Sequence, residues 1–208
     1  RYQQMLYLFR KENGELVQEA LLPTLFVPMT GTAEERRVVL PDPSHPAIYN
    51  GGFEEASEGE EIKPIGWHYI RQAHVTQQQD ATEGKACLEF ANAELGRPSR
   101  ALQAFPIDGR EVREIEISLD VKGKDVQLLP ARRQSPMLAI TFYDERRAII
   151  TQRGMGPWQG TFAWQTEREK IDVPVRAREA IVRIGMFGAS GEACFDNLTL
   201  TVTQRKGK

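Results

Sequence analysis

The sequence predicts an all-β protein in which a jelly-roll sandwich of two packed sheets follows a short β-hairpin. From Leu198 to Val202, apolar residues alternate with threonines, which is the two-residue period of a strand with one buried face. Several earlier stretches show the same alternation, and glycine, proline or charged residues bound each of them, as an antiparallel sandwich requires. No stretch predicts an amphipathic helix, since Glu167–Lys170 is too short.

Composition describes an ordinary globular protein with no electrostatic specialisation. The 208 residues are 40% hydrophobic and 27% charged, which is ample material for a core. The formal net charge of -2 and the pI of about 6.0 give no reason to expect nucleic acid or an anionic membrane as a partner. No apolar run approaches the roughly 20 residues that span a bilayer. The chain begins without a signal peptide or an initiator Met, so we expect a piece of a longer protein whose compartment is encoded elsewhere. The oligomeric state is left open.

The first residues predict a small hairpin. Gln4–Arg10 is expected to form one strand and Leu16–Leu22 its returning arm, with the Asn-Gly pair inside Lys11–Glu15 as the turn signal. Leu25–Pro28 predicts another short strand, ended by a proline that cannot donate to a ladder. A two-stranded piece is marginally stable by itself, so this unit is expected to lean on something else.

The same segment resembles the C-terminal tail of protein-L-isoaspartate O-methyltransferases. The likeness runs through Tyr2–Phe9, Gly14–Leu16 and Leu25–Gly31, and so covers residues 1–31. It implies a parent enzyme that transfers a methyl group from S-adenosylmethionine to L-isoaspartate in damaged proteins. Such a site needs a glycine-rich loop before a helix, whereas Gly154–Pro157 predicts only a turn. We therefore expect that this chain alone neither binds S-adenosylmethionine nor methylates a substrate.

A charged and then proline-rich stretch predicts an exposed connector before the sandwich. The expected organisation is a methyltransferase tail over residues 1–31, a linker over 32–46, a jelly-roll sandwich over 47–203 and a disordered tail over 204–208. Strands of the sandwich are expected to open at Phe53 and to follow at 65–70, 84–90, 100–107, 114–121, 138–144, 161–166, 180–187 and 194–202.

A second resemblance covers nearly all of residues 48–203. Asn50–Glu54 with Gly66-Trp67, Trp158 with Val173-Pro174, and Phe195–Leu200 are similar to the carbohydrate-binding modules of the galactose-binding-like jelly-roll superfamily. The likeness indicates the fold better than the ligand, because one fold carries many functions. It implies a non-catalytic accessory module that binds a carbohydrate or another ligand, such as a protein. The alternative is a structural or oligomerisation domain that binds no small molecule.

The second resemblance also implies a metal site. Glu54 and Asp196 match positions where those modules hold a structural calcium ion. Calcium takes six to eight oxygen ligands, so two carboxylates with backbone carbonyls from Gly84-Lys85 would tie the first strand to the last. In the alternative interpretation, turn amides hydrogen-bond both carboxylates without a metal.

Sugar binding needs exposed aromatic planes beside polar groups, because the C–H faces of a sugar stack on rings while its hydroxyls need hydrogen-bond partners. The candidate ligand-binding residues are Tyr69, Tyr143, Trp158 and Arg183. The rings of Trp67 and Trp164 are expected to be buried instead.

Other reactive side chains do not form a recognisable catalytic set. Glu114 and Glu116 share a strand face and are expected to be solvated charges rather than a catalytic pair. The three histidines have no spacing typical of a triad or of a metal site. Cys87 and Cys194 are too few for a disulfide framework, although a single bridge between them stays open.

Overall fold

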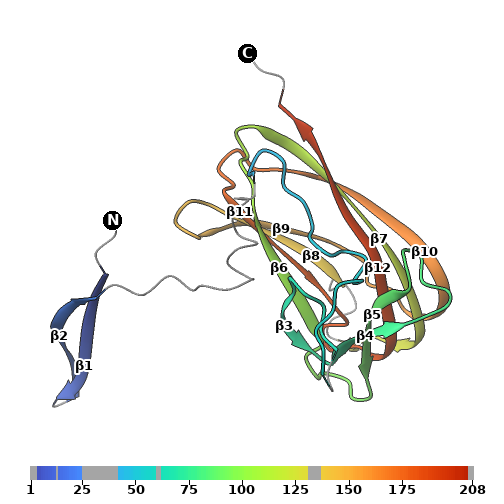
Figure 1. Ribbon diagram of the computed structural model, residues 1–208, viewed down its shortest axis with the longest axis horizontal. Coiled ribbons are helices and arrows are strands. Elements are labelled where there is room, and N and C mark those ends of the chain that lie inside the picture. Colours follow the sequence, from blue (N-terminus) through green and yellow to red (C-terminus); the bar gives the residue numbers. More distant parts are fainter. Residues whose placement is uncertain (1–3, 13, 25–41, 60–61, 131–136, 206–208) are drawn as a thin grey trace. The chain divides into compact units, whose positions relative to one another are not determined.

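The computed structural model describes residues 4–12, 14–24, 42–59, 62–130 and 137–205 (Figure 1). The chain divides into two compact units, Arg1–Leu40 and Pro41–Lys208. Every regular element in the described part of the chain is a β-strand, and no helix among those residues is long and apolar enough to cross a membrane.

The first unit contains the predicted hairpin. Strand β1 (Gln4–Glu12) pairs antiparallel with β2 (Glu15–Thr24), and the turn passes through Gly14 at a φ of 91°. A left-handed φ of this kind is easily adopted by glycine, which explains the turn at the Asn-Gly signal. The predicted strand over residues 25–28 lies outside the described residues.

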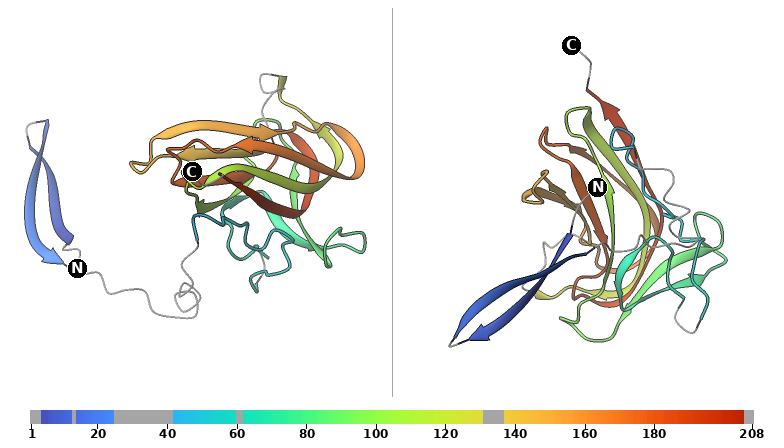
Figure 2. Two further views of the ribbon diagram at one scale, coloured as in Figure 1. Left: turned by 90° about the horizontal axis from the view of Figure 1, so that it is seen from above. Right: turned by 60° about the vertical axis from the view of Figure 1, so that its left-hand side comes forward.

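The second unit is a sandwich of two five-stranded antiparallel sheets (Figures 1 and 2), which confirms the predicted jelly-roll class. One sheet has the order β10-β7-β12-β5-β4 and the other has the order β3-β6-β11-β8-β9. Their strands are β3 (His68–Arg71), β4 (Ala73–Gln77), β5 (Ala86–Asn92), β6 (Arg100–Pro106), β7 (Val112–Gln127), β8 (Leu138–Tyr143), β9 (Ile149–Met155), β10 (Gly160–Asp172), β11 (Glu179–Ile184) and β12 (Ser190–Gln204).

The core lies between the sheets and is filled by alternate residues of the strands. Along β7, Ile115, Ile117 and Leu119 are fully buried, as the alternation predicts. The ring of Phe195 on β12 lies edge-on to Phe90 on β5, with ring centroids 5.5 Å apart. Edge-to-face aromatic pairs of this kind add to the stabilisation from burial.

Strand β12 holds the first sheet together because it pairs with both β5 and β7. Its pairing with β5 ends at Phe195, and its register against β7 shifts between Asp196 and Thr199. Beyond the shift, Leu198 is buried and Leu200 and Val202 pack against the core, which confirms the alternation predicted for the closing strand.

The described strands differ from the predicted ones in three places. Phe53 does not open a strand: it lies in a loop at a φ of 58°, with its ring fully buried 5.5 Å from that of Trp67. Strands β4 and β9 were not predicted, because both are edge strands with little one-sided burial. The strand predicted over residues 161–166 is longer, since β10 continues through residues 167–170 to Asp172, and this agrees with the expectation that 167–170 form no helix.

Candidate functional site

One candidate site lies on the outer side of the β3-β6-β11-β8-β9 sheet. Directly opposed residues of an antiparallel pair share a face, and Arg183 of β11 lies opposite Leu102 of β6 and Ala139 of β8. Its neighbours Val182 and Ile184 are buried in the core, so Arg183 points the other way. The side that carries Arg183 is called the β11 face below, and its residues are Leu102, Ala104, Ala139, Thr141, Tyr143, Gln152, Glu179, Ile181 and Arg183.

Three polar side chains of the β11 face form a network. Arg183 donates through Nη2 to Oε1 of Gln152 at 2.6 Å and to Oγ1 of Thr141 at 3.2 Å. Thr141 also donates to Oε1 of Gln152 at 3.3 Å. Both described contacts of the guanidinium use Nη2, although arginine carries five N–H donors. The network fixes the orientation of the arginine and leaves its other nitrogens for a ligand.

Tyr143 ends the same face. It lies half-buried opposite Glu179 of β11, four residue pairs along the ladder from the pair that contains Arg183. At a rise of about 3.4 Å per residue, these pairs are separated by roughly 13 Å. The carboxylate of Glu179 accepts two hydrogen bonds from Arg147, at 2.9 and 3.0 Å. The structure therefore brings two of the predicted ligand-binding residues, Tyr143 and Arg183, to one face.

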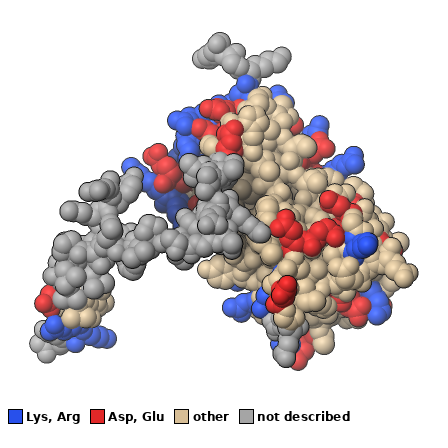
Figure 3. Space-filling model, in the orientation of Figure 1, with Lys and Arg blue, Asp and Glu red and all other residues tan. Residues whose placement is uncertain are grey.

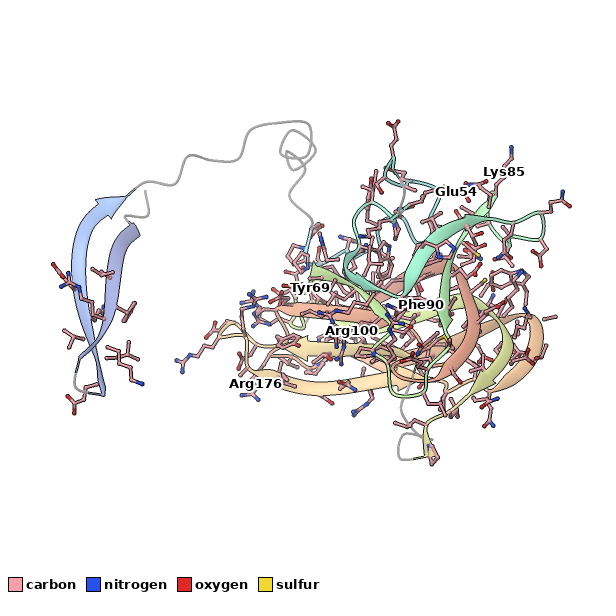
Figure 4. All side chains as sticks on the ribbon, turned by 90° about the horizontal axis from the view of Figure 1, so that it is seen from below. Glu54, Tyr69, Lys85, Phe90, Arg100 and Arg176 are labelled. Carbon is pink, nitrogen blue, oxygen red and sulfur yellow. The ribbon has the colours of Figure 1, made fainter. Side chains whose placement is uncertain are left out.

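The other two predicted aromatic residues, Tyr69 and Trp158, differ in how far solvent reaches them. Tyr69 lies on the edge strand β3 of the same sheet with 71% of its surface exposed, and Figure 4 labels it. Trp158 is only 9% exposed, and its ring lies 6.1 Å from that of Phe195 in the core. The expectation that Trp158 offers a free face to a sugar is corrected, because the core covers that ring.

The predicted metal-binding carboxylates hold one loop between them. Asp196 is fully buried, and its Oδ2 accepts hydrogen bonds from the backbone N–H and hydroxyl of Thr82 and from the N–H of Glu83, at 2.8 to 3.0 Å. Oδ1 accepts one from the N–H of Asn197 at 2.7 Å. Burial raises the pKa of Asp196, while these donors oppose the rise.

Glu54 completes this arrangement from the opening segment. Its Oε1 accepts the N–H groups of Lys85 and Ala86 at 2.8 and 2.7 Å. The loop passes under it at Gly84, where φ is 58° and a Cβ would lie 2.4 Å from the carboxylate of Glu54. Only glycine suits both conditions. Residues 82–86 with Glu54 and Asp196 are called the carboxylate clasp below.

The clasp does not fit calcium in the described conformation. The backbone presents N–H donors, not carbonyl oxygens, to Glu54 and Asp196, whereas calcium needs six to eight oxygens. No group of three His, Cys, Asp or Glu side chains with metal-binding geometry occurs among the residues described. These contacts are those of the metal-free alternative, and the ion stays a prediction to be tested.

The clasp loop also borders the two cysteines. Cys87 and Cys194 are free thiols on the neighbouring strands β5 and β12, with 0% and 5% of their surfaces exposed. Gln78 donates to Sγ of Cys194 at 3.3 Å. Nearby, the Lys122 ammonium lies 4.9 Å from the ring centre of Trp164, which is half-buried rather than part of the core.

One further cluster contains residue types typical of a hydrolase triad. Nδ1 of His45 contacts both the hydroxyl of Ser44 at 2.9 Å and Oδ2 of Asp42 at 2.8 Å. A catalytic histidine instead uses its two ring nitrogens for separate partners, so this local turn does not form a triad. The hydrogen bond from Ser44 holds the pKa of Asp42 at about 2.

Charges elsewhere are mixed. Figure 3 shows basic and acidic side chains interspersed on the side of the sandwich that it draws. Glu116 of β7 lies 3.5 Å from the ammonium of Lys170 on β10, on the outer side of the other sheet. Sequence reasoning missed Thr141 and Gln152: the pairing of β8 with β11 brings Thr141 to Arg183, and the pairing of β8 with the unpredicted strand β9 adds Gln152.

Comparisons with known proteins support the fold but not a particular function. No protein-family description matches the chain, and no curated protein matches it either. Among solved structures, the enzymatically active domain of tailspike protein 4 of bacteriophage CBA120 has a TM-score of 0.57 at 15% identity, over 75% of this chain and 21% of that one. A family 16 carbohydrate-binding module has a TM-score of 0.50 at 13% identity, over 74% of this chain and 98% of that one. The CBM22-1 xylan-binding domain of Paenibacillus barcinonensis Xyn10C gives 0.50 at 13%, over 75% and 94%.

At these identities the comparisons establish a shared fold. The sandwich has the jelly-roll architecture of carbohydrate-binding modules, and the same architecture occurs within an enzymatically active tailspike domain. Function must therefore be argued from the side chains of this chain.

Proposed function

We propose that the sandwich is a non-catalytic accessory module that binds a carbohydrate on the β11 face. The observation that carries the proposal is the network of Arg183, Gln152 and Thr141, which orients polar groups on the same face as Tyr143. Sugars are bound by such combinations, because an aromatic ring accepts a C–H face while nearby amide and guanidinium groups bind hydroxyls. Tyr69 on the edge strand of this sheet adds a ring that is more exposed than that of Tyr143.

The fold and the chemistry of the face support binding over a purely structural role. The solved structures with this fold include two carbohydrate-binding modules. An oligomerisation surface is typically a large contiguous apolar patch, whereas Arg183, Gln152 and Glu179 divide the β11 face. The rival structural or oligomerisation function predicts self-association and no small ligand.

A glycan array followed by calorimetry on the 208-residue chain tests the proposal. Substituting Arg183→Gln or Tyr143→Ala should weaken the captured glycan at least tenfold, because each removes a direct contact. Arg113→Gln is the matched control, since Arg113 is exposed on β7 of the other sheet. Absence of binding to every glycan, together with dimers in sedimentation, would favour the structural role.

We also propose that this module is joined to the C-terminus of a protein-L-isoaspartate O-methyltransferase. The support is the resemblance over residues 1–31 and the hairpin that β1 and β2 form there. The reading frame upstream of Arg1 should then encode a glycine-rich loop for S-adenosylmethionine. The longer protein should methylate an isoaspartyl peptide, while the 208-residue chain alone should not bind the cofactor. An upstream sequence without that loop would remove the methyltransferase from the proposal.

A further inference from the structure

A groove lies where the chain passes from one sheet to the other. Strand β3 ends at Arg71 and β4 begins at Ala73, so the crossing takes place at Gln72. The groove beside this crossing has a volume of about 770 Å³, within the range of small-molecule sites. Its walls come from the crossing, from Ile62-Lys63 and from Arg97-Pro98.

The groove is basic although the chain is not. Lys63, Arg71, Arg97 and the imidazole of His74 line it, and no Asp or Glu does so among the residues described. The whole chain has 29 acidic and 27 basic residues, so this is a local excess of positive charge. A concave site whose described lining holds cations and no carboxylate raises the local concentration of anions.

Among the described residues, Arg71 in the groove wall and Arg100 on the neighbouring strand lack the contacts that arginines usually have. Arg71 lies directly opposite Arg100 of β6, and like charges in that position destabilise a sheet. Within the described part of the chain, neither side chain makes an ion pair or a hydrogen bond. The repulsion between Arg71 and Arg100 destabilises the free protein. It is expected where an anion binds between the two guanidinium groups and removes that repulsion.

Two unsatisfied buried polar atoms lie in residues next to the groove wall in sequence. Three buried side-chain polar atoms have no hydrogen-bond partner among the described residues, and two of them are Oγ of Ser99 and Nε of Arg100. These residues directly follow Arg97-Pro98 in the groove wall. Because buried polar atoms are nearly always paired in folded proteins, such a concentration calls for a partner. Arg100 is one of the residues labelled in Figure 4.

The backbone at the crossing is unusual as well. Tyr69 and Gln72 have φ values of 50° and 53°, and neither is glycine. Non-glycine residues in the left-handed region are uncommon and tend to occur at binding sites, where the surrounding structure maintains them. Here they flank the two-residue segment that ends in Arg71.

We propose that this groove binds the carboxylate of a uronic acid unit, so that the ligand of the module is an acidic glycan. The inference rests on carbohydrate binding at the β11 face and names its substrate class. Arg100 lies two residues before Leu102 on β6, and Leu102 is opposite Arg183, so Arg100, which pairs with Arg71 of the groove wall, lies on the same sheet face as Arg183. Arginine forks match the planar carboxylate with paired N–H donors.

Calorimetry on the 208-residue chain in calcium-free buffer tests this, with oligogalacturonate and its fully methyl-esterified form as ligands. The two ligands have the same sugar chain and differ at the carboxyl groups, where a methyl ester replaces the negative charge. The acid should bind at least tenfold tighter than the ester at 50 mM NaCl, and the ratio should shrink at 300 mM as salt screens the contact. Equal affinities would overturn the inference while leaving the proposed function in place.

Two variants locate the contact. Arg71→Gln and Arg97→Gln should each lower affinity for the acid about three- to tenfold and leave the ester unchanged, whereas Arg183→Gln should weaken both ligands. Arg113→Gln should alter neither.

Arg71→Gln should also keep or raise the unfolding temperature without ligand, since it removes a like charge opposite Arg100; a marked fall would overturn the unpaired-charge argument. If the acid still binds tenfold tighter than the ester in the double variant, the groove is not the anion site. Failure of every glycan to bind would count against the proposed function itself.

Discussion

Replacing the buried carboxylate of the clasp, Asp196→Asn, should destabilise the sandwich by about 2–4 kcal/mol. The carboxylate accepts four hydrogen bonds, three at Oδ2 and one at Oδ1. If the amide oxygen takes the place of Oδ2, its NH2 group faces the N–H of Asn197 and leaves that donor unpaired, at about 1–3 kcal/mol. The other three bonds lose the assistance of the charge, about 1 kcal/mol each. Burial raises the pKa of Asp196 because a buried negative charge is poorly solvated. The neutral amide avoids this desolvation cost, which offsets part of the loss.

Urea unfolding followed by tryptophan fluorescence measures the effect. With an m-value of about 2 kcal/mol/M, a loss of 2–4 kcal/mol lowers the midpoint by roughly 1–2 M. Asp172→Asn is the matched control, since Asp172 is exposed on β10 and should give a change within about 0.5 kcal/mol. An unchanged midpoint for Asp196→Asn would refute the view that the carboxylate holds the loop.

The same assay tests the predicted calcium ion. If Glu54 and Asp196 bind calcium, adding the ion must stabilise the native protein in proportion to the logarithm of its concentration. That stabilisation must disappear in Glu54→Gln as well as in Asp196→Asn. An identical midpoint in calcium and in a chelator would leave the amide contacts as the sole function of the pair.

The remaining predictions concern acid stability, the core and the loop. A hydrogen bond from Arg110 holds the pKa of Asp108 at about 2, against an ordinary value of 3.8. Since the folded-state pKa is depressed, its contribution of up to ~2 kcal/mol is present above pH 4 and lost as the pH falls toward 2. Asp108→Asn should therefore flatten the stability profile between these values, and a profile that keeps its slope would contradict the assignment. Phe195→Ala should cost about 3–5 kcal/mol, while the exposed Tyr69→Ala should stay within about 0.5 kcal/mol; comparable losses in thermal unfolding would invalidate the assigned core. Gly84→Ala should cost about 1–3 kcal/mol, because it combines a left-handed φ with a collision against a carboxylate. A neutral result in urea would show that the loop relaxes.

Long strands that bury one face were predictable from the sequence. Alternation identified β7 and β12 because both lie inside a sheet and direct alternate apolar residues toward the core. Edge strands β4 and β9 give a weak signal, since solvent reaches residues of both parities. Phe53 shows a second limit, because a loop residue supplies a core ring without any period.

The candidate site was less predictable, since it depends on contacts distant in sequence. Tyr143 and Arg183 were chosen by residue type, but only the pairing of β8 with β11 shows that they share a face. Trp158 was misjudged because glycine and proline next to it indicate an exposed loop, whereas Phe195 and the core cover its ring. For Glu54 and Asp196 the positions were found, but sequence alone does not say whether amides or an ion lie between them.

The two buried thiols provide an intrinsic reporter on the carboxylate clasp. Cys87 and Cys194 lie on the outer side of their sheet and yet are shielded, with Gln78 in contact with one of them. A thiol reagent can reach the two cysteines only when the segment that contains Gln78 moves away from them. The labelling rate therefore measures how often this segment opens in the native protein. A change at Asp196 that loosens the segment would then be visible as faster labelling even under conditions where the sandwich stays folded.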